Sequence, residues 1–469
     1  MPKRNLAWIL VVVMIALLMW QLPQTIARRD SVSQAFGPLV DVRAQIHKRY
    51  VEDVEDEALV SSAVRGGIEA MLEGLGDRYA RYYDQEQFER LQDRTAGRFG
   101  GLGIEVWATA QGLQVHGVVR DSPAAGAGIA PGDVITQVDG LPTAGLPLVE
   151  AVHDLLNGPP GTEAALTLVR PDGHGGEATR EVRLRRAVIR IDPIRGWCRT
   201  PTGGWRFLFD ETAGIGYVRL TKFMPNVDRR LDSVVNRLLR ENLHGLILDM
   251  RNNPGGLRDS ASDVADRFLD HGLIVSTGGR RADGKQWYAT RDGTYPSFHL
   301  VVLINGSTAS AAEIVAGALH DHRRAVVVGE RSYGKGSVQE VIPLAPGNGA
   351  IKITTAFYFL PNGECVQRTP AAIKSGSWGV APDVLVPMTE QQQQAALVVW
   401  RELGGERPAG GSTQPAQGRS AASADPDFYD RAARRLLAVD AQLKAAADTL
   451  RGKIVPPVAG GGRHLRGGV

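Results

Sequence analysis

Between residues 214 and 330, short apolar runs alternate with amphipathic stretches, and this alternation limits the possible folds more than any other feature of the sequence. The apolar runs have the length and composition of buried strands: 214–220, 245–250, 300–305 and 325–330. The stretches between them carry apolar residues at helical spacing: 227–241, 258–270 and 309–320. Strands that alternate with helices in this way predict a mixed α/β core, which we place at residues 189–403.

The chain on either side of this core has a different pattern. Residues 31–95 have helical periodicity, whereas residues 96–188 consist of short strands and turns around one amphipathic helix at 147–156. The second segment therefore predicts a small β domain, which begins with a hairpin at 103–119. After the core, the sequence predicts a low-complexity linker, a single helix and a disordered Gly-rich tail: 404–426, 427–451 and 452–469. The predicted fold class is a multidomain α+β protein.

The N-terminus indicates export. Lys3 and Arg4 precede fifteen consecutive apolar residues, 6–20. This pattern is typical of a signal peptide or of a membrane anchor, so we assign residues 1–30 to that segment. We expect the rest of the chain outside the cytoplasm, on the periplasmic or extracellular face, either anchored or secreted if the segment is cleaved.

Composition excludes several classes of protein. A chain of 469 residues is too long for one ordinary core, so two or more domains are expected. The net charge of +3 arises from nearly balanced basic and acidic residues, which argues against a dedicated nucleic-acid binder. With only Cys198 and Cys365, the chain has neither a disulfide-dense scaffold nor a four-thiolate zinc site.

The stretch GERSYGKGS at 329–337 follows an apolar run and has the G-x-x-x-x-G-K spacing of a phosphate-binding loop. Such a loop also requires Ser or Thr directly after the lysine, and a helix whose first amides hold phosphate. Here Gly336 follows Lys335, and the β-branched residues 337–344 with Pro343 predict a strand. The sequence therefore argues against a nucleotide site at Lys335.

Ser310 lies where a hydrophobic strand gives way to a helix, within the stretch NGSTASAAE at 305–313. With Glu313 it fits the S-x-x-E pattern of a helix-capping box, which is a structural interpretation. The position also suits a nucleophile, because the N–H groups that follow it at the positive end of a helix can stabilise an oxyanion. The residues alone leave both interpretations open.

A nucleophilic serine needs a base, and the sequence offers two kinds. His320 and His322 follow Ser310 closely, but ten residues of helix rise about 15 Å, so a structural role is favoured for both. Lys335 follows the next strand, and the ends of successive parallel strands lie together. Lysine is a base only when neutral, so its pKa must fall from ~10.4 towards neutrality through burial or nearby charge. Gln339 would lie on the same strand face as Lys335, where it could orient the amine.

The stretch DMRNNPGG at 249–256 follows another predicted strand. Pro-Gly-Gly ordinarily marks a turn. Glycine also lets a backbone N–H approach a developing oxyanion closely, because it has no Cβ. These residues are consistent with either role.

Taken together, these stretches resemble the C-terminal processing peptidases, also called tail-specific proteases. The landmarks occur in the family's order and are specific as a set: GYVRLTKF (216–223), LILDMRNNPGG (246–256), NGSTASAAEIVAGAL (305–319), VVGERSYGKGSVQ (327–339) and APDVLV (381–386). In the β domain, GRFGGLGIEV (97–106) and DSPAAGAGIAPGDVITQVDG (121–140) resemble the PDZ domain of this family. The resemblance covers roughly residues 31–400. It implies a crotonase-like α/β protease core with an inserted PDZ domain and an N-terminal helical segment.

The resemblance also implies a role for individual residues. It places the nucleophile on Ser310, the general base on Lys335 and a lysine-orienting glutamine on Gln339. The oxyanion hole would come from backbone N–H groups of Ala311 and of Gly255 or Gly256. Backbone amides of the PDZ domain would capture the terminal carboxylate of a peptide that adds as a strand, near Leu102, Gly103 and Ile104. The chain departs from the family at Glu364-Cys365, where a basic residue and a serine are usual, which puts substrate contacts there in question.

These features predict a serine endopeptidase with a Ser/Lys dyad. Its substrates would be exported or membrane-associated proteins with unstructured C-terminal tails that the PDZ domain recognises. We expect polypeptide substrates, the membrane and an adaptor or activator protein as partners, with no nucleic acid, no cofactor and no metal. The alternative is a non-catalytic PDZ scaffold with a protease-like core.

Overall fold

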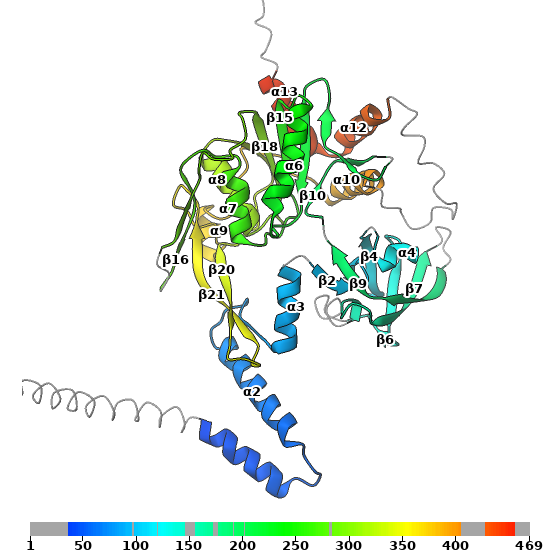
Figure 1. The fold of residues 1–469 in the computed structure, drawn as a ribbon, viewed down its shortest axis with the longest axis vertical. Coiled ribbons are helices and arrows are strands. Elements are labelled where there is room, and N and C mark those ends of the chain that lie inside the picture. Colours follow the sequence, from blue (N-terminus) through cyan, green and yellow to red (C-terminus); the bar gives the residue numbers. More distant parts are fainter. Residues whose placement is uncertain are drawn as a thin grey trace, which may run out of the picture. The chain divides into compact units, whose positions relative to one another are not determined.

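The structure is a computed structural model that describes residues 36–95, 98–119, 121–145, 155–171, 177–190, 192–200, 202–280, 284–404 and 427–454 (Figure 1). The predicted N-terminal segment and nearly all of the linker and tail lie outside these residues, as does most of the predicted helix at 147–156. Within the described residues, no helix has the length and apolar character needed to span a membrane. The described chain forms two compact units, one of which combines the residues up to Asp84 with Val341–Ile353.

The smaller unit is mostly helical, as the periodicity predicted. Residues 36–49 and α2 (Asp56–Glu73) are helices, and Leu72 is the buried residue of α2. The sequence did not predict the strand β1 (Arg81–Tyr83), which pairs antiparallel with the first residues of β21 (Ala350–Phe359). Three residues carry too little pattern to be recognised as a strand, so this element depends on its distant partner.

In the larger unit, α3 (Gln85–Thr95) leads into the β domain. A sheet with the order β3-β4-β5-β7-β8 surrounds an apolar core that includes Leu113, Ile135 and Leu168, while β2 pairs with β9 and β6 with β5. The elements are β2 (Arg98–Gly101), β3 (Ile104–Thr109), β4 (Gly112–Val118), α4 (Pro123–Gly126), β5 (Val134–Val138), β6 (Leu141–Pro142), β7 (Glu163–Pro171), β8 (Glu177–Arg185) and β9 (Ala187–Arg190). The hairpin predicted at 103–119 is confirmed as β3 and β4.

A sheet of seven strands, in the order β10-β14-β15-β18-β19-β22 with β13 beside β14, forms the centre of the α/β core. Neighbouring strands from β14 to β22 run parallel, as the alternation with helices predicted. The strands are β10 (Ile194–Arg195), β13 (Leu208–Asp210), β14 (Ile215–Leu220), β15 (Gly245–Asp249), β18 (His299–Ile304), β19 (Val326–Gly329) and β22 (Val384–Leu385). A two-stranded ribbon joins β11 (Cys198–Arg199) to β12 (Trp205–Arg206). Both cysteines are free thiols.

Helices cover both faces of this sheet (Figure 1). Alternate strand residues such as Leu246 and Ile247 belong to two separate apolar clusters, because successive side chains point to opposite faces. One cluster includes residues of α6 (Val227–Arg240), α7 (Arg258–Asp266) and α8 (Ala311–Asp321). The other includes residues of α10 (Glu390–Leu403), α12 (Phe428–Val439) and α13 (Ala441–Ile454).

The structure corrects one prediction in the C-terminal segment. The single helix expected at 427–451 is two helices, α12 and α13, which are separated at Asp440. Asp440 has extended backbone angles (φ −104°, ψ 91°), and its carboxylate accepts a hydrogen bond from the backbone N–H of Leu443. A buried side chain that caps the second helix therefore interrupts the periodic pattern.

Strands β16, β17, β20 and β21 belong to a further sheet. The end of β21 pairs with β16 (Leu273–Gly278), β16 pairs with β17 (Gln286–Tyr288), and β20 (Ser337–Pro343) pairs with β21; the short helix α9 (Pro370–Ser375) follows. Because a strand and not a helix follows Lys335, the chain lacks the helix N-terminus that a phosphate-binding loop requires.

Candidate active site

Ser310 occupies a strained position at the carboxyl end of the parallel sheet, directly before α8. Its φ of +57° and ψ of −120° lie outside the regions that residues with a Cβ usually adopt. Contacts on both sides hold this turn, because the Thr308 hydroxyl donates to the carbonyl of Met250 and the N–H of Ala309 donates to the carbonyl of Asn253. Strain of this kind persists where the surrounding structure enforces it, and it is frequent at catalytic residues.

The carboxylate of Glu313 lies beneath Ser310 and is completely buried. Its Oε2 accepts hydrogen bonds from the backbone N–H of Ser310 (2.7 Å) and of Lys335 (2.8 Å). Its Oε1 accepts from the hydroxyl of Ser332 and the N–H of Gly334, both at 2.6 Å. Burial raises the pKa of Glu313, while these hydrogen bonds act in the opposite direction. Glu313 therefore has more contacts than the helix cap that the S-x-x-E pattern indicated.

This carboxylate joins the two residues that the sequence proposed as nucleophile and base. Oε2 of Glu313 accepts from both backbone N–H groups, so two hydrogen bonds to one oxygen atom connect the backbone at Ser310 to the backbone at Lys335. The hydroxyl of Tyr358 adds a second connection, since it donates to the carbonyl of Lys335 (2.5 Å) and lies 3.2 Å from the carbonyl of Ser310. No motif in the sequence indicated a role for Tyr358, which is in β21.

Gln339 lies on β20, as predicted. Its Nε2 donates to the hydroxyl of Ser337 (2.9 Å) and to that of Thr354 (3.3 Å). These contacts fix the side chain on the strand, and the proposed contact with the lysine amine stays a prediction.

In the loop after β15, Gly255 lies close to Ser310 and to the residues on either side of it, Ala309 and Ala311. A Cβ on Gly255 would lie 2.8 Å from the Cβ of Ser310 and 2.9 Å from the nitrogen of Ala311. The N–H of Gly255 is bound to the side-chain oxygen of Asn253 (2.9 Å). Gly256 faces Phe223 in a β-bridge that uses the carbonyl of Gly255 and the N–H of Leu257, so its own N–H takes no part in the bridge. Gly255 and Gly256 therefore differ in whether their N–H is already bound, and the part of either in an oxyanion hole stays a prediction.

Ala311 is the first residue of α8, where a backbone N–H has no acceptor inside the helix. Such a group, at the positive end of the helix, suits the second position of an oxyanion hole. The two histidines lie at the other end of α8. His320 contacts Asp321 and Asp383 (3.0 and 3.4 Å), and the ring of His322 binds the carbonyl of Leu273 (2.7 Å).

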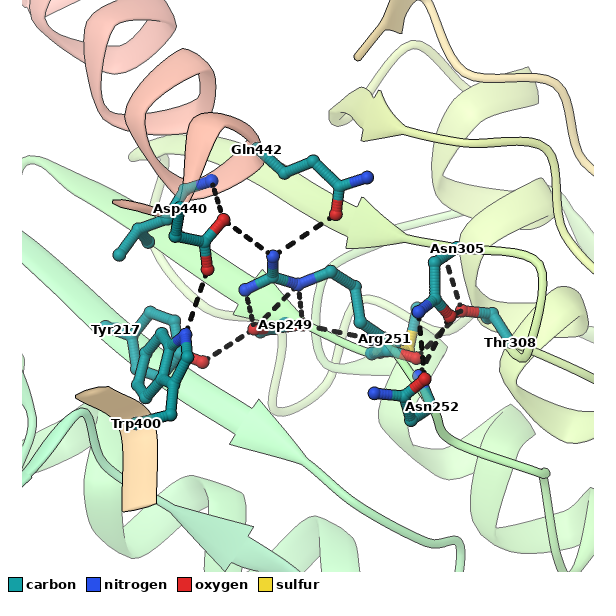
Figure 2. Close-up of polar contacts among 11 residues, drawn as sticks. Tyr217, Asp249, Arg251, Asn252, Asn305, Thr308, Trp400, Asp440 and Gln442 are labelled. Carbon is teal, nitrogen blue, oxygen red and sulfur yellow. Dashed lines mark hydrogen bonds and ion pairs between the residues drawn. The ribbon is translucent and has the colours of Figure 1, made fainter. Parts of the chain in front are cut away.

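A buried ion network supports the loop after β15 (Figure 2). The guanidinium of Arg251 contacts Asp249 through Nη2 (2.7 Å) and Asp440 through Nη1 (2.9 Å). Burial opposes the charge of Asp249, but Arg251 and Arg219 outweigh it and lower the pKa of Asp249 to about 2. The sequence predicted the loop but not this network, whose members come from distant parts of the chain.

The proposed peptide-binding residues of the β domain lie at the start of β3. Leu102 is in the apolar core, and its carbonyl accepts from the N–H of Ala124 (3.1 Å). Gly103 has a φ of +77°, and a Cβ there would overlap Ser122. Ile104 pairs with Val118 in the β3–β4 hairpin. The structure thus explains why glycine stands at 103, and carboxylate capture at these residues stays a prediction.

Comparison with known proteins identifies the two main segments. Residues 214–386 match peptidase family S41, and residues 114–170 match the PDZ domain. The chain is 34% identical over 421 residues to the carboxy-terminal-processing protease of Bartonella bacilliformis, and the match covers 88% of each chain. It is 34% identical over 324 residues to the carboxyl-terminal-processing protease of a Synechocystis species, covering 68% of this chain and 70% of the relative.

Among solved structures, the photosystem II D1 C-terminal processing protease is similar, with 28% identity, a TM-score of 0.47, and coverage of 79% of this chain and 92% of that chain. The match to the Bartonella protein extends beyond both the PDZ and the peptidase segments. The chain therefore belongs to peptidase family S41 and is a serine-type endopeptidase of the carboxy-terminal-processing kind.

Proposed function

We propose that Ser310 is the nucleophile and Lys335 the general base of this endopeptidase. The observation that carries the proposal is the carboxylate of Glu313, which binds the backbone of both residues and so holds a strained serine beside the lysine loop. The histidines, at the far end of α8, do not offer an alternative base near Ser310.

In this mechanism neutral Lys335 accepts the hydroxyl proton of Ser310 as the Oγ attacks a peptide carbonyl. The N–H groups of Ala311 and Gly256 donate to the oxyanion. The lysinium then gives its proton to the leaving amine, and water hydrolyses the acyl-enzyme with Lys335 again as base. Each step conserves protons, and none requires a metal or a cofactor.

We further propose that the substrates are exported or membrane-associated proteins with accessible, unstructured C-terminal tails. The PDZ domain supports this, since domains of this class bind a peptide end as an added strand. The apolar segment at 6–20 supports a location outside the cytoplasm. An adaptor or activator protein that acts through the PDZ domain is consistent with this arrangement.

The experiment compares the protein with its Ser310→Ala and Lys335→Ala variants on an unfolded protein substrate. We expect both variants to lose cleavage while they remain folded. Equal cleavage by Ser310→Ala and the unchanged protein would remove Ser310 from the mechanism. Full activity of Lys335→Ala would assign the base to another residue.

The alternative of a non-catalytic PDZ scaffold predicts that the unchanged protein does not cleave any unfolded substrate. The strained backbone at Ser310 argues against it, because a scaffold gains nothing from a position that costs of order 1–3 kcal/mol.

A further inference from the structure

The junction between α12 and α13 contains a buried carboxylate with an unusual set of partners (Figure 2). Asp440 is 1% exposed. Its Oδ1 accepts from the N–H of Leu443 and from Nη1 of Arg251, both at 2.9 Å, and its Oδ2 accepts from the indole N–H of Trp400 at 2.9 Å. One side chain thus caps a helix and pairs with an arginine 189 residues earlier in the chain.

These contacts close a ring of interactions around the end of β15. Arg251 binds Asp249 through Nε and Nη2, and Asp249 accepts from the hydroxyl of Tyr217 (2.6 Å). The ring of Tyr217 stacks on Trp400 at 5.2 Å between centroids, and Trp400 donates to Asp440. The members come from β14, β15, the loop after β15, α10 and the α12–α13 junction, so the C-terminal segment completes the ring.

A second acceptor from the same segment contacts Arg251. The Oε1 of Gln442 lies 3.2 Å from Nη1 of Arg251, and its Nε2 donates to the carbonyl of Val386 (2.9 Å). Asp440 and Gln442 together satisfy the nitrogen of Arg251 that Asp249 does not reach. Removing Asp440 would take away one of the two buried carboxylates that pair with this guanidinium and leave Nη1 with the neutral Gln442, which is costly.

Arg251 passes this constraint to the nucleophile. The next residue, Asn252, exchanges two hydrogen bonds with the side chain of Asn305, at 3.0 and 2.9 Å. The backbone carbonyl of Asn253 accepts from the N–H of Ala309 (2.9 Å), and its side-chain Oδ1 accepts from the N–H of Gly255 (2.9 Å). The residues that follow Arg251 therefore contact both ends of the turn that carries Ser310.

We propose that Asp440, assisted by Gln442, is a positioning residue for catalysis. Asp440 and Gln442 bind Nη1 of Arg251, whereas Asp249 binds Nε and Nη2. Through these contacts the C-terminal helix pair sets the position of the loop after β15 (residues 250–256, the oxyanion loop) relative to Ser310. This segment lies outside the residues that match peptidase family S41, and nothing in its local pattern indicates a part in the reaction. The inference rests on the proposed function, because it concerns the oxyanion loop of the same site.

The test uses Asp440→Asn in the full chain, with Asp210→Asn as the matched control. Asp210 pairs with Arg451 of α13 at 2.7 Å, so the control removes another carboxylate charge that joins the same helix to the core, away from the oxyanion loop. We expect kcat of Asp440→Asn to fall between about tenfold and about a hundredfold, with KM changed less than about twofold, because a displaced donor affects the transition state only. The control should keep kcat within about twofold while its Tm falls.

Gln442→Met decides the question if Asp440→Asn does not fold, because it removes a neutral acceptor and leaves the helix cap intact. We expect a smaller loss of kcat in the same direction, again without a change of KM. Two combinations of results would overturn the inference. In both, kcat of Gln442→Met is unchanged. In addition, Asp440→Asn either has the same kcat as the control or does not fold. If Ser310→Ala retains activity, the proposed function itself fails, and this outcome is distinct from the previous one.

Chemical rescue separates positioning from simple stability. A cavity of about 700 Å³ is lined by Arg251, Trp400, Asp440 and Gln442, so a small anion can reach the vacated position in Asp440→Ala. We expect formate to restore kcat of Asp440→Ala several-fold, and formamide at the same concentration to have no effect. Equal recovery with formamide, or none with formate in a folded variant, would contradict a role for the carboxylate charge.

Discussion

Replacement of Glu313 by glutamine perturbs the contact that brings Ser310 and Lys335 together. The carboxylate accepts from four donors within 2.8 Å, two on each oxygen, and the hydroxyl of Tyr358 lies 3.5 Å from its Oε2. With its NH2 group towards Ser310 and Lys335, a glutamine amide would face two backbone N–H groups and leave both without an acceptor. Turned round, the NH2 group would face the hydroxyl of Ser332, which can accept instead of donate, and the N–H of Gly334, which would lose its acceptor.

The magnitude follows from these contacts. Loss of one or two hydrogen bonds to a charged acceptor costs about 1.5–6 kcal/mol, at about 1.5–3 kcal/mol each. Part of this is recovered, because burial raises the pKa of Glu313 and so disfavours the charge that the substitution removes. We therefore expect the free energy of unfolding to fall by about 2–4 kcal/mol. We expect kcat to fall about a hundredfold, because the nucleophile and base lose their common support.

The assay combines urea unfolding with steady-state cleavage of an unfolded protein. Glu330→Gln is the matched control, because the Oε1 of Glu330 accepts from a single backbone N–H, that of Met388 (2.9 Å), and an amide oxygen can replace it. If Glu313→Gln is as stable and as active as Glu330→Gln, Glu313 is not the common support of Ser310 and Lys335.

Three further predictions concern other parts of the site. The folded pKa of Asp249 is lowered, so its contribution to stability is present above its unfolded pKa of ~3.9 and is lost as pH falls towards about 2. The difference in free energy of unfolding between the protein and Asp249→Asn, measured with urea, should therefore shrink over that pH range. A difference that grows as pH falls would contradict the ion network. Gly256→Ala should abolish cleavage, because φ is +142° and a Cβ would lie 2.0 Å from the carbonyl oxygen of Phe223; normal kcat in a folded variant would exclude this glycine from the oxyanion hole. His322→Ala should keep kcat within about twofold, since the ring binds a backbone carbonyl at the far end of α8, and inactivity of a stable variant would favour a histidine base.

The local periodicity of the sequence was sufficient to predict most of the α/β core. Strands β14, β15, β18 and β19 and the helices between them lie where the apolar runs and amphipathic stretches indicated. Each of these elements has a pattern within its own residues, so no knowledge of distant contacts was needed. The loop positions of Ser310 and Lys335 followed from the same pattern.

The parts that could not be predicted depend on distant contacts. The S-x-x-E pattern indicated a cap at Ser310, but three of the donors to Glu313 come from residues 19 to 22 positions later. The helical periodicity gave no sign of the break at Asp440, because Arg251 and Trp400, which hold its buried carboxylate, are distant in the sequence. The positive φ of Ser310 could not be predicted from its residue type, because serine does not favour that conformation.

Exchanging the amine of Lys335 for another amine tests whether this residue is the general base. In a Cys365→Ser background, Lys335→Cys should be inactive, and aminoethylation of the new thiol should restore cleavage by placing an amine at the same position. Cys198 is a poor competitor for the reagent, because it is buried and its pKa is raised to about 11. A sulfur in the side chain lowers the pKa of the amine, so the acid limb of the pH profile of kcat/KM should move to lower pH if this amine is the general base. Activity of Lys335→Cys before treatment, or restored activity with an unmoved acid limb, would contradict the Ser310–Lys335 dyad.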